Sequence, residues 1–112
     1  MRPLSLSRDT FHILVALADG ERHGYSIMRE VAERTGGAVR LSPSTLYSAV
    51  KRLLEAGYIE ELQERPDPAH DDERRRYYRL TRDGRRAALE EARQWEKLLS
   101  DARSSGLVPK RV

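Results

Sequence analysis

The feature that most restricts the fold of this 112-residue chain is a basic segment in which a strand pattern leads directly into a capped helix. Residues 75–80, Arg-Arg-Tyr-Tyr-Arg-Leu, alternate as the two faces of a strand do. Thr81 follows at once, and threonine is a favoured residue for capping the first turn of a helix. The sequence therefore predicts a strand joined to a helix without a loop, with arginine at most of its solvent-facing positions.

Apolar periodicity and cap residues predict the remaining elements. Proline at position 43 suits the first turn of a helix, and glycine at position 57 suits its end. The expected order is a helix from Ser7 to Gly20, a helix that Gly36 and Gly37 stop, a brief strand over 38–41, a helix from Ser42 to Gly57, strands over 58–62 and 75–80, and a helix over 81–103.

This order predicts a mainly α fold with a small β-hairpin. It is the order of a winged helix-turn-helix, which would occupy residues 1–80. Residues 81–103 would form a C-terminal dimerisation helix, and residues 104–112 a disordered tail.

The C-terminal helix carries a short heptad seam that nothing further along the chain can cover. The first helix is apolar on so much of its surface that it too is expected to face a second subunit. The sequence therefore predicts a homodimer. Its expected interface comprises Phe11, Leu14, Ala88, Ala92, Trp95, Leu99 and Ala102.

Composition narrows the classes of function. The chain has no cysteine, which excludes disulfides and thiolate metal sites, and its three histidines lack metal-ligand spacing. No Gly-x-Ser-x-Gly turn or phosphate-cradling glycine loop is present, so we expect neither catalysis nor a cofactor. No apolar run approaches the length of a membrane span, and we expect a cytoplasmic protein with no membrane partner.

The predicted third helix and the basic strand are the candidate DNA-binding elements. Helical spacing fixes an apolar face through Leu46, Val50 and Leu53, so the polar side chains must point the other way. Small hydroxyls let a helix approach the floor of a groove, and cationic side chains reach guanine edges or phosphates. The expected contacts are Ser42, Ser44, Thr45, Tyr47, Ser48, Lys51, Arg52, Arg74, Arg75, Arg76 and Arg79.

Two alternatives stand beside double-stranded DNA as the partner. The basic strand can be balanced by Glu60, Glu61 and Glu64 on the neighbouring strand, which would leave a solvated surface. In the second alternative, the chain is a winged helix for protein interaction, whose basic strand meets an acidic partner and binds polyanions without sequence preference. Tyr47 lies at the boundary of the helix's apolar face and can serve either the core or a phosphate.

Trp95 also allows two interpretations. It sits in the heptad seam, where a large apolar ring packs a dimer. Alternatively, two Trp95 rings would flank a pocket for a small aromatic effector, since Ala88, Ala92 and Ala102 leave space that leucine would have filled.

Three motifs resemble the PadR family of bacterial transcription regulators. His23-Gly24-Tyr25-Ser26-Ile27 is similar to the opening of that family's second helix, and residues 41–47, Leu-Ser-Pro-Ser-Thr-Leu-Tyr, to the start of its recognition helix. Residues 77–84, Tyr-Tyr-Arg-Leu-Thr-Arg-Asp-Gly, resemble its wing strand and the turn into its last helix. The motifs occur in the family's order and span residues 4–102.

The resemblance implies a dimeric repressor of the family's short subgroup, joined through its C-terminal helix. It implies inverted-repeat operators and, for some members, a flat hydrophobic ligand between the subunits. The chain departs from the pattern at residues 65–73, which are long, acidic and proline-rich where many relatives have a short Gly-Arg-Pro turn.

Overall fold

The computed structural model describes residues 6–62 and 76–109. The fold class is the predicted one, mainly helical with a small antiparallel sheet of winged-helix type. The elements are α1 (Arg8–Ala16), β1 (Arg22–His23), α2 (Gly24–Arg34), α3 (Pro43–Ala56), β2 (Ile59–Glu61), β3 (Tyr77–Leu80) and α4 (Arg82–Ser104).

The helix starts follow the side-chain chemistry of their caps. Ser7, Ser42 and Thr81 accept hydrogen bonds from backbone N–H groups in the first turns of α1, α3 and α4, as predicted. The cap of α2 was not predicted: it is the Nδ1 atom of His23, which accepts from Ser26 N at 3.1 Å.

The sheet has three strands in the order β1-β3-β2, all antiparallel. The hairpin of β2 and β3 was predicted, and Ile59 lies opposite Leu80 in it. The short strand β1 was missed, because Arg22 and His23 alone cannot show an alternating pattern. The strand predicted over 38–41 is wrong: that segment has no strand, although the side chains of Val39 and Leu41 are buried in the core.

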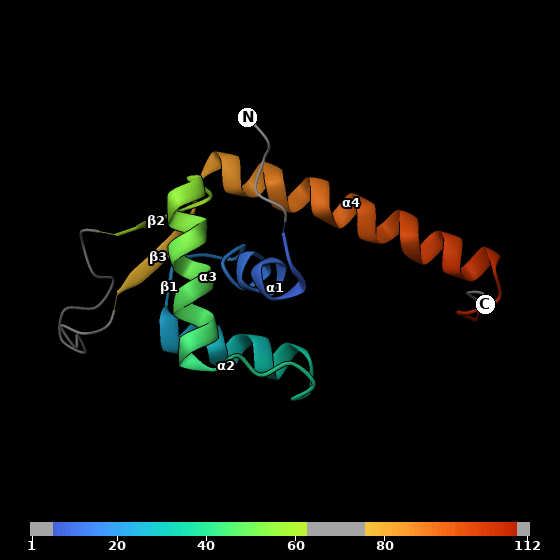
Figure 1. The fold of residues 1–112 in the computed structure, drawn as a ribbon, viewed down its shortest axis with the longest axis horizontal. Coiled ribbons are helices and arrows are strands. Elements are labelled where there is room, and N and C mark those ends of the chain that lie inside the picture. The colour runs from blue at the N-terminus through green and yellow to red at the C-terminus, as the bar shows by residue number, and fades with distance from the viewer. Residues whose placement is uncertain (1–5, 63–75, 110–112) are drawn as a thin grey trace.

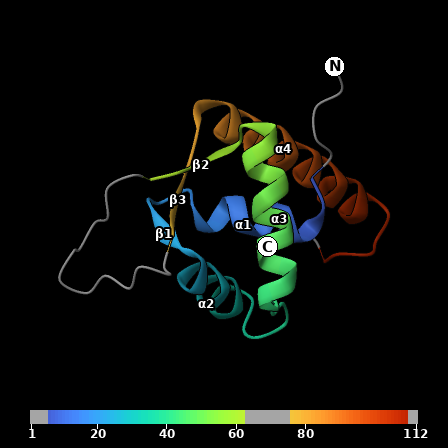
Figure 2. The same ribbon diagram turned by 60° about the vertical axis from the view of Figure 1, so that its left-hand side comes forward.

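Helix α1 is the centre of the helical packing. It lies between α2 and α4, with α3 crossing beside it (Figures 1 and 2). The core fills the space between α1, α2, α3 and the sheet. Its buried side chains are Ile13, Leu14, Ala16, Leu17, Ile27, Val31, Val39, Leu41, Leu46, Ala49, Val50, Leu53, Ile59 and Tyr78.

One predicted interface residue is corrected by this packing. Leu14 was expected to face a second subunit, but its side chain is 0% exposed inside the chain's own core. Ile13, Ala16 and Leu17 of α1 are buried with Leu14, while Phe11 is only half-buried. Because α1 has apolar residues around most of its surface, periodicity alone did not fix which side faces inward.

The junction between α3 and α4 is fixed by contacts with the turn at residues 57–58. The Thr81 hydroxyl donates to the carbonyl oxygen of Gly57 at 2.6 Å, and the Thr81 amide donates to that of Tyr58 at 3.1 Å. Gly84 is buried, and the backbone of Tyr58 lies where a Cβ on Gly84 would stand. The first turn of α4 therefore lies directly on the turn that follows α3.

Helix α4 continues well past this junction and projects beyond the other helices (Figure 1). It runs to Ser104, one residue beyond the predicted end, and closes in a turn in which Leu107 N donates to Ala102 O at 2.9 Å and Gly106 has a φ of 77°. Residues 104–109 of the predicted disordered tail are thus part of the described structure, and residues 110–112 lie outside it.

Gly84→Ala tests this junction. An added Cβ would overlap backbone atoms that cannot rotate away, so we expect a loss of about 3 kcal/mol, the upper end of the usual cost of overpacking. The measurement is urea denaturation followed by circular dichroism. Arg82→Ala, in the same helical turn but exposed, is the control and should change the stability by less than about 0.5 kcal/mol. Equal stability of the two variants would contradict the tight junction.

Candidate nucleic-acid interface

Helix α3 presents one continuous polar surface. Its capped start and the burial of Leu46, Ala49, Val50 and Leu53 fix the rotation of the helix against the core. The predicted contact residues on α3, together with the capping Ser42, are accordingly exposed. They are Ser42, Ser44, Thr45, Tyr47, Ser48, Lys51 and Arg52, with Glu55 at the C-terminal end of the same surface.

The hydroxyls at the start of α3 are partly used by the helix itself. Ser42 Oγ accepts from Thr45 N at 3.1 Å and donates to Thr45 Oγ1 at 3.0 Å. Ser44 and Ser48 form no side-chain hydrogen bond with the part of the chain that the structure describes. The hydroxyls of Ser44 and Ser48 are therefore available to a ligand.

Lys51 and Arg52 are exposed cations with no acidic partner in the part of the chain that the structure describes. Neither forms an ion pair within residues 6–62 and 76–109. They follow Ser44 and Ser48 along α3, so hydroxyls and then cations lie along one helical surface. This arrangement suits a helix that approaches the groove floor at its start and reaches base edges or phosphates with the cations further along.

Tyr47 packs against α2 and is also exposed to solvent. The sequence left open whether this residue belongs to the core or to the contact surface. Its hydroxyl oxygen lies 2.6 Å from where a Cβ on Gly24 would stand, so the ring covers the first residue of α2. The residue is nevertheless 48% exposed. Gly24 thus lets α2 and α3 approach closely, and Tyr47 keeps half of its surface available at that junction.

Tyr25 is a candidate that sequence reasoning did not include. It lies in the first turn of α2 and is 60% exposed. In helix-turn-helix proteins the helix that precedes the recognition helix crosses the DNA backbone. The sequence does contain a sign of this role: Tyr25 comes just before Ile27 and Val31, the apolar positions of α2, and so lies at the start of that helix.

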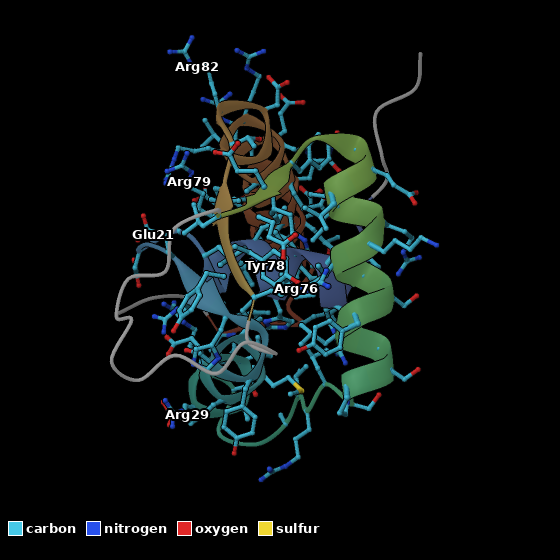
Figure 3. The ribbon with its side chains drawn as sticks, turned by 90° about the vertical axis from the view of Figure 1, so that its left-hand side faces the viewer. Glu21, Arg29, Arg76, Tyr78, Arg79 and Arg82 are labelled. Atoms are coloured by element: carbon cyan, nitrogen blue, oxygen red, sulfur yellow. The ribbon has the colours of Figure 1, made fainter. Side chains whose placement is uncertain are left out.

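The basic strand has two different faces. Tyr78 is buried and Leu80 packs against the core, while Arg79 points away from it, as the alternation predicted. Figure 3 shows Arg76 and Tyr78 on the side of β3 that faces α3, and Arg79 on the opposite side with Glu21 and Arg82. Arg74, Arg75 and the acidic segment 65–73 lie outside the described residues.

Both described arginines of the wing are paired with acids on β2. Arg76 Nε lies 3.5 Å from Glu61 Oε1, and Arg79 Nε lies 2.6 Å from Glu60 Oε1. The side chains of both pairs are 38–68% exposed, so each is worth only about 0–1 kcal/mol. Of the balancing acids that the sequence allowed as an alternative, Glu60 and Glu61 therefore pair with these arginines, but weakly, and Glu64 lies outside the described residues.

The structure does not bring Arg79 together with α3. Its side chain borders a hollow on the far side of the sheet, lined also by Leu17, Glu21, Leu80 and Arg85. Arg79 therefore lies apart from the candidate contact surface on α3. Alternation predicted that Arg79 points away from the core. It could not show whether that side of the strand lies near α3.

Tyr78 marks the place where the sheet meets α3. Burial raises the pKa of the Tyr78 phenol. Electrostatic interactions with Glu61 and then with Tyr47 raise this pKa further, and the interaction with Arg76 lowers it. Glu61 lies opposite Tyr78 in the ladder of β2 and β3, and Arg76 lies on the same side of β3 as Tyr78.

The predicted dimer seam is partly covered within the chain. The Phe11 and Trp95 rings lie parallel, with 6.3 Å between centroids and 5° between planes, and Trp95 Nε1 donates to Glu91 Oε1 at 3.1 Å. Ala88, Ala92 and Ala102 are half-buried, whereas Leu99 is 41% exposed. Trp95 remains 42% exposed, and further apolar surface on α4 comes from Leu89 and Leu98.

Neither a metal centre nor a membrane span is found in the described parts of the chain. No cluster of three or more His, Cys, Asp or Glu side chains occurs within residues 6–62 and 76–109. Over the same residues, none of the helices combines the length and the apolar character needed to cross a bilayer.

Solved structures with the same fold are regulators of transcription. A transcriptional regulator from Clostridium thermocellum is 27% identical, with a TM-score of 0.72 over 89% of this chain and 97% of that one. A PadR family regulator from Clostridium difficile is 23% identical, with a TM-score of 0.75 over 88% and 97%. Bacillus subtilis PadR, solved in complex with operator DNA, is 23% identical, with a TM-score of 0.65 over 77% of this chain and 47% of that one.

The family of PadR-like transcriptional regulators matches residues 13–90. This range includes α2, α3, the three strands and the first turns of α4, and it contains the three motifs whose resemblance pointed to that family. Members of the family are regulators of transcription rather than enzymes. The chain therefore belongs to the PadR-like family of transcriptional regulators.

Proposed function

We propose that this protein is a cytoplasmic homodimer that represses transcription by placing α3 of each subunit in the major groove of an inverted-repeat operator. The observation that carries the proposal is the polar surface of α3, where Lys51 and Arg52 follow Ser44 and Ser48. Among the described residues, the two cations have no ion-pair partner and the two hydroxyls no hydrogen-bond partner. The fold shared with Bacillus subtilis PadR, which was solved on operator DNA, supports this use of the surface.

The wing contributes phosphate contacts in this proposal. Arg76 lies on the side of β3 that faces α3, so a duplex held by α3 is within reach of its side chain. Arg74 and Arg75 precede it and extend the same basic segment. Such contacts set the register of the protein on DNA and contribute to affinity without reading sequence.

Lys51→Ala and Arg52→Ala test the recognition surface. Each change should weaken binding to a selected operator by about 1–3 kcal/mol if the side chain reads a base edge, measured by fluorescence anisotropy at fixed salt. Arg79→Ala removes the same charge from the far side of the sheet and should have a clearly smaller effect. A loss for Arg79→Ala that matches the other two would contradict a contact surface centred on α3.

The dimer is proposed to form through α4 and the adjoining part of α1. Phe11, Ala88, Ala92, Trp95, Leu99 and Ala102 remain from the predicted interface once Leu14 is excluded. The projecting half of α4 leaves Leu98 and Leu99 exposed, and a second copy related by a twofold axis would cover them.

Leu99→Glu tests this interface. In a twofold dimer the new carboxylate would be buried near its own symmetry mate, so we expect a monomer at micromolar concentrations in analytical ultracentrifugation. Leu107→Glu is the control, because Leu107 is 81% exposed in the turn after α4, outside the seam. A Leu99→Glu protein that remains dimeric would place the interface elsewhere.

A small aromatic effector is proposed to bind at the exposed face of Trp95. Phe11 lies parallel to the ring and Glu91 accepts from its indole N–H, so Trp95 is held in place with 42% of its surface left open. A flat ligand between two such rings would sit in the dimer seam.

Tryptophan fluorescence tests this site directly, because Trp95 is the only tryptophan in the chain. Planar aromatic compounds should quench it saturably and shift the affinity for DNA in parallel. No saturable response across a varied panel would mean that Trp95 serves only to pack the dimer.

A further inference from the structure

The ion pair between Glu61 and Arg76 closes the hairpin on the side that faces α3. Glu61 is the last residue of β2 and lies opposite Tyr78 in the ladder. Arg76 stands two residues before Tyr78, so both point to the same side of β3. The distance between Arg76 Nε and Glu61 Oε1 is 3.5 Å.

This pair borders the proposed contact surface. Arg76 lies on the side of β3 that faces α3 (Figure 3), and Glu61 lies opposite the buried Tyr78 in the ladder, so the pair adjoins α3. The second pair, Glu60 with Arg79, has the same chemistry but lies on the opposite side of the sheet. The hairpin thus carries two like ion pairs, of which one adjoins α3.

The Glu61–Arg76 pair is weak enough to be exchanged. Its side chains are 38% and 68% exposed, and exposed pairs contribute about 0–1 kcal/mol. A phosphate in a duplex offers the same oxygen acceptors as the carboxylate, within a field of many negative charges. Arg76 can therefore leave Glu61 for a phosphate at small cost.

We propose that Glu61 is an affinity-determining residue of the DNA-binding surface. In the free protein it holds Arg76 as an intramolecular counter-ion, and a phosphate must displace it when DNA binds. Glu61 then stands beside the phosphate without a partner and takes up a cation from solution. Glu61 thereby lowers the affinity for DNA of any sequence. It also weakens the dependence of that affinity on salt, which the contact of Arg76 with a phosphate would otherwise increase. This inference rests on the proposed function.

Glu61→Gln tests the exchange, because the amide keeps the shape of the side chain and removes its charge. We expect roughly two- to fivefold tighter binding to a random-sequence duplex at low salt, which corresponds to the worth of one exposed ion pair. The slope of log K against log salt should become steeper by up to about one. Thermal unfolding would confirm that the variant retains its fold.

Glu60→Gln is the matched control. It changes the net charge by the same amount and releases Arg79 on the far side of the sheet, so both affinity and slope should stay close to those of the unchanged protein. If Glu61→Gln behaves like Glu60→Gln, the proposed exchange is wrong.

The double variant Glu61→Gln with Arg76→Gln separates exchange from simple repulsion. If Glu61 acts through Arg76, the gain from Glu61→Gln should disappear when Arg76→Gln is already present. A gain that persists would mean that Glu61 merely repels phosphate, and would overturn the proposal. Failure of the unchanged protein to bind any duplex would contradict both this inference and the proposed function, whereas normal binding with no effect of Glu61→Gln would contradict this inference alone.

Discussion

The contact between the first turn of α4 and the turn after α3 is the constraint on which the proposed dimer depends. Thr81 binds the backbone at Gly57 and Tyr58 while it caps α4, and Gly84 allows the backbones to meet. One end of α4 is therefore fixed to the end of α3, the proposed recognition helix. If α4 pairs with its symmetry mate, the same contact sets the separation and direction of the two α3 helices, and so the spacing of the half-sites.

The sequence predicted the helices well, because each signal was local. The hydroxyls of Ser42 and Thr81 cap helices as expected, and the apolar spacing on α3 predicted its buried face. The strand β1 and the brief strand expected over 38–41 were the failures. Both depend on pairing with distant residues: β1 exists because Arg22 and His23 meet Tyr78 and Tyr77 of β3, whereas Val39 and Leu41 are buried without a strand partner.

For the candidate site, too, the local features could be predicted from the sequence and the contacts between distant residues could not. Helical periodicity was sufficient to find the exposed residues of α3, since one face of that helix must pack. It could not show that Arg76 faces α3 while Arg79 lies beyond the sheet, nor that Glu61 and Glu60 bind them. Leu14 failed for a related reason, because an amphipathic helix with two apolar edges can be rotated either way until its neighbours are known.

The proposed function requires this chain to read DNA sequence as a twofold dimer. Selection of bound duplexes from a random pool, at near-physiological salt and with excess competitor, tests it most directly. We expect enrichment of an inverted repeat whose half-sites are centred about one helical turn apart, roughly 10 base pairs, or a multiple of it. Recovery of a pool no different from the input would contradict the account, and would leave the basic surfaces as a general polyanion patch.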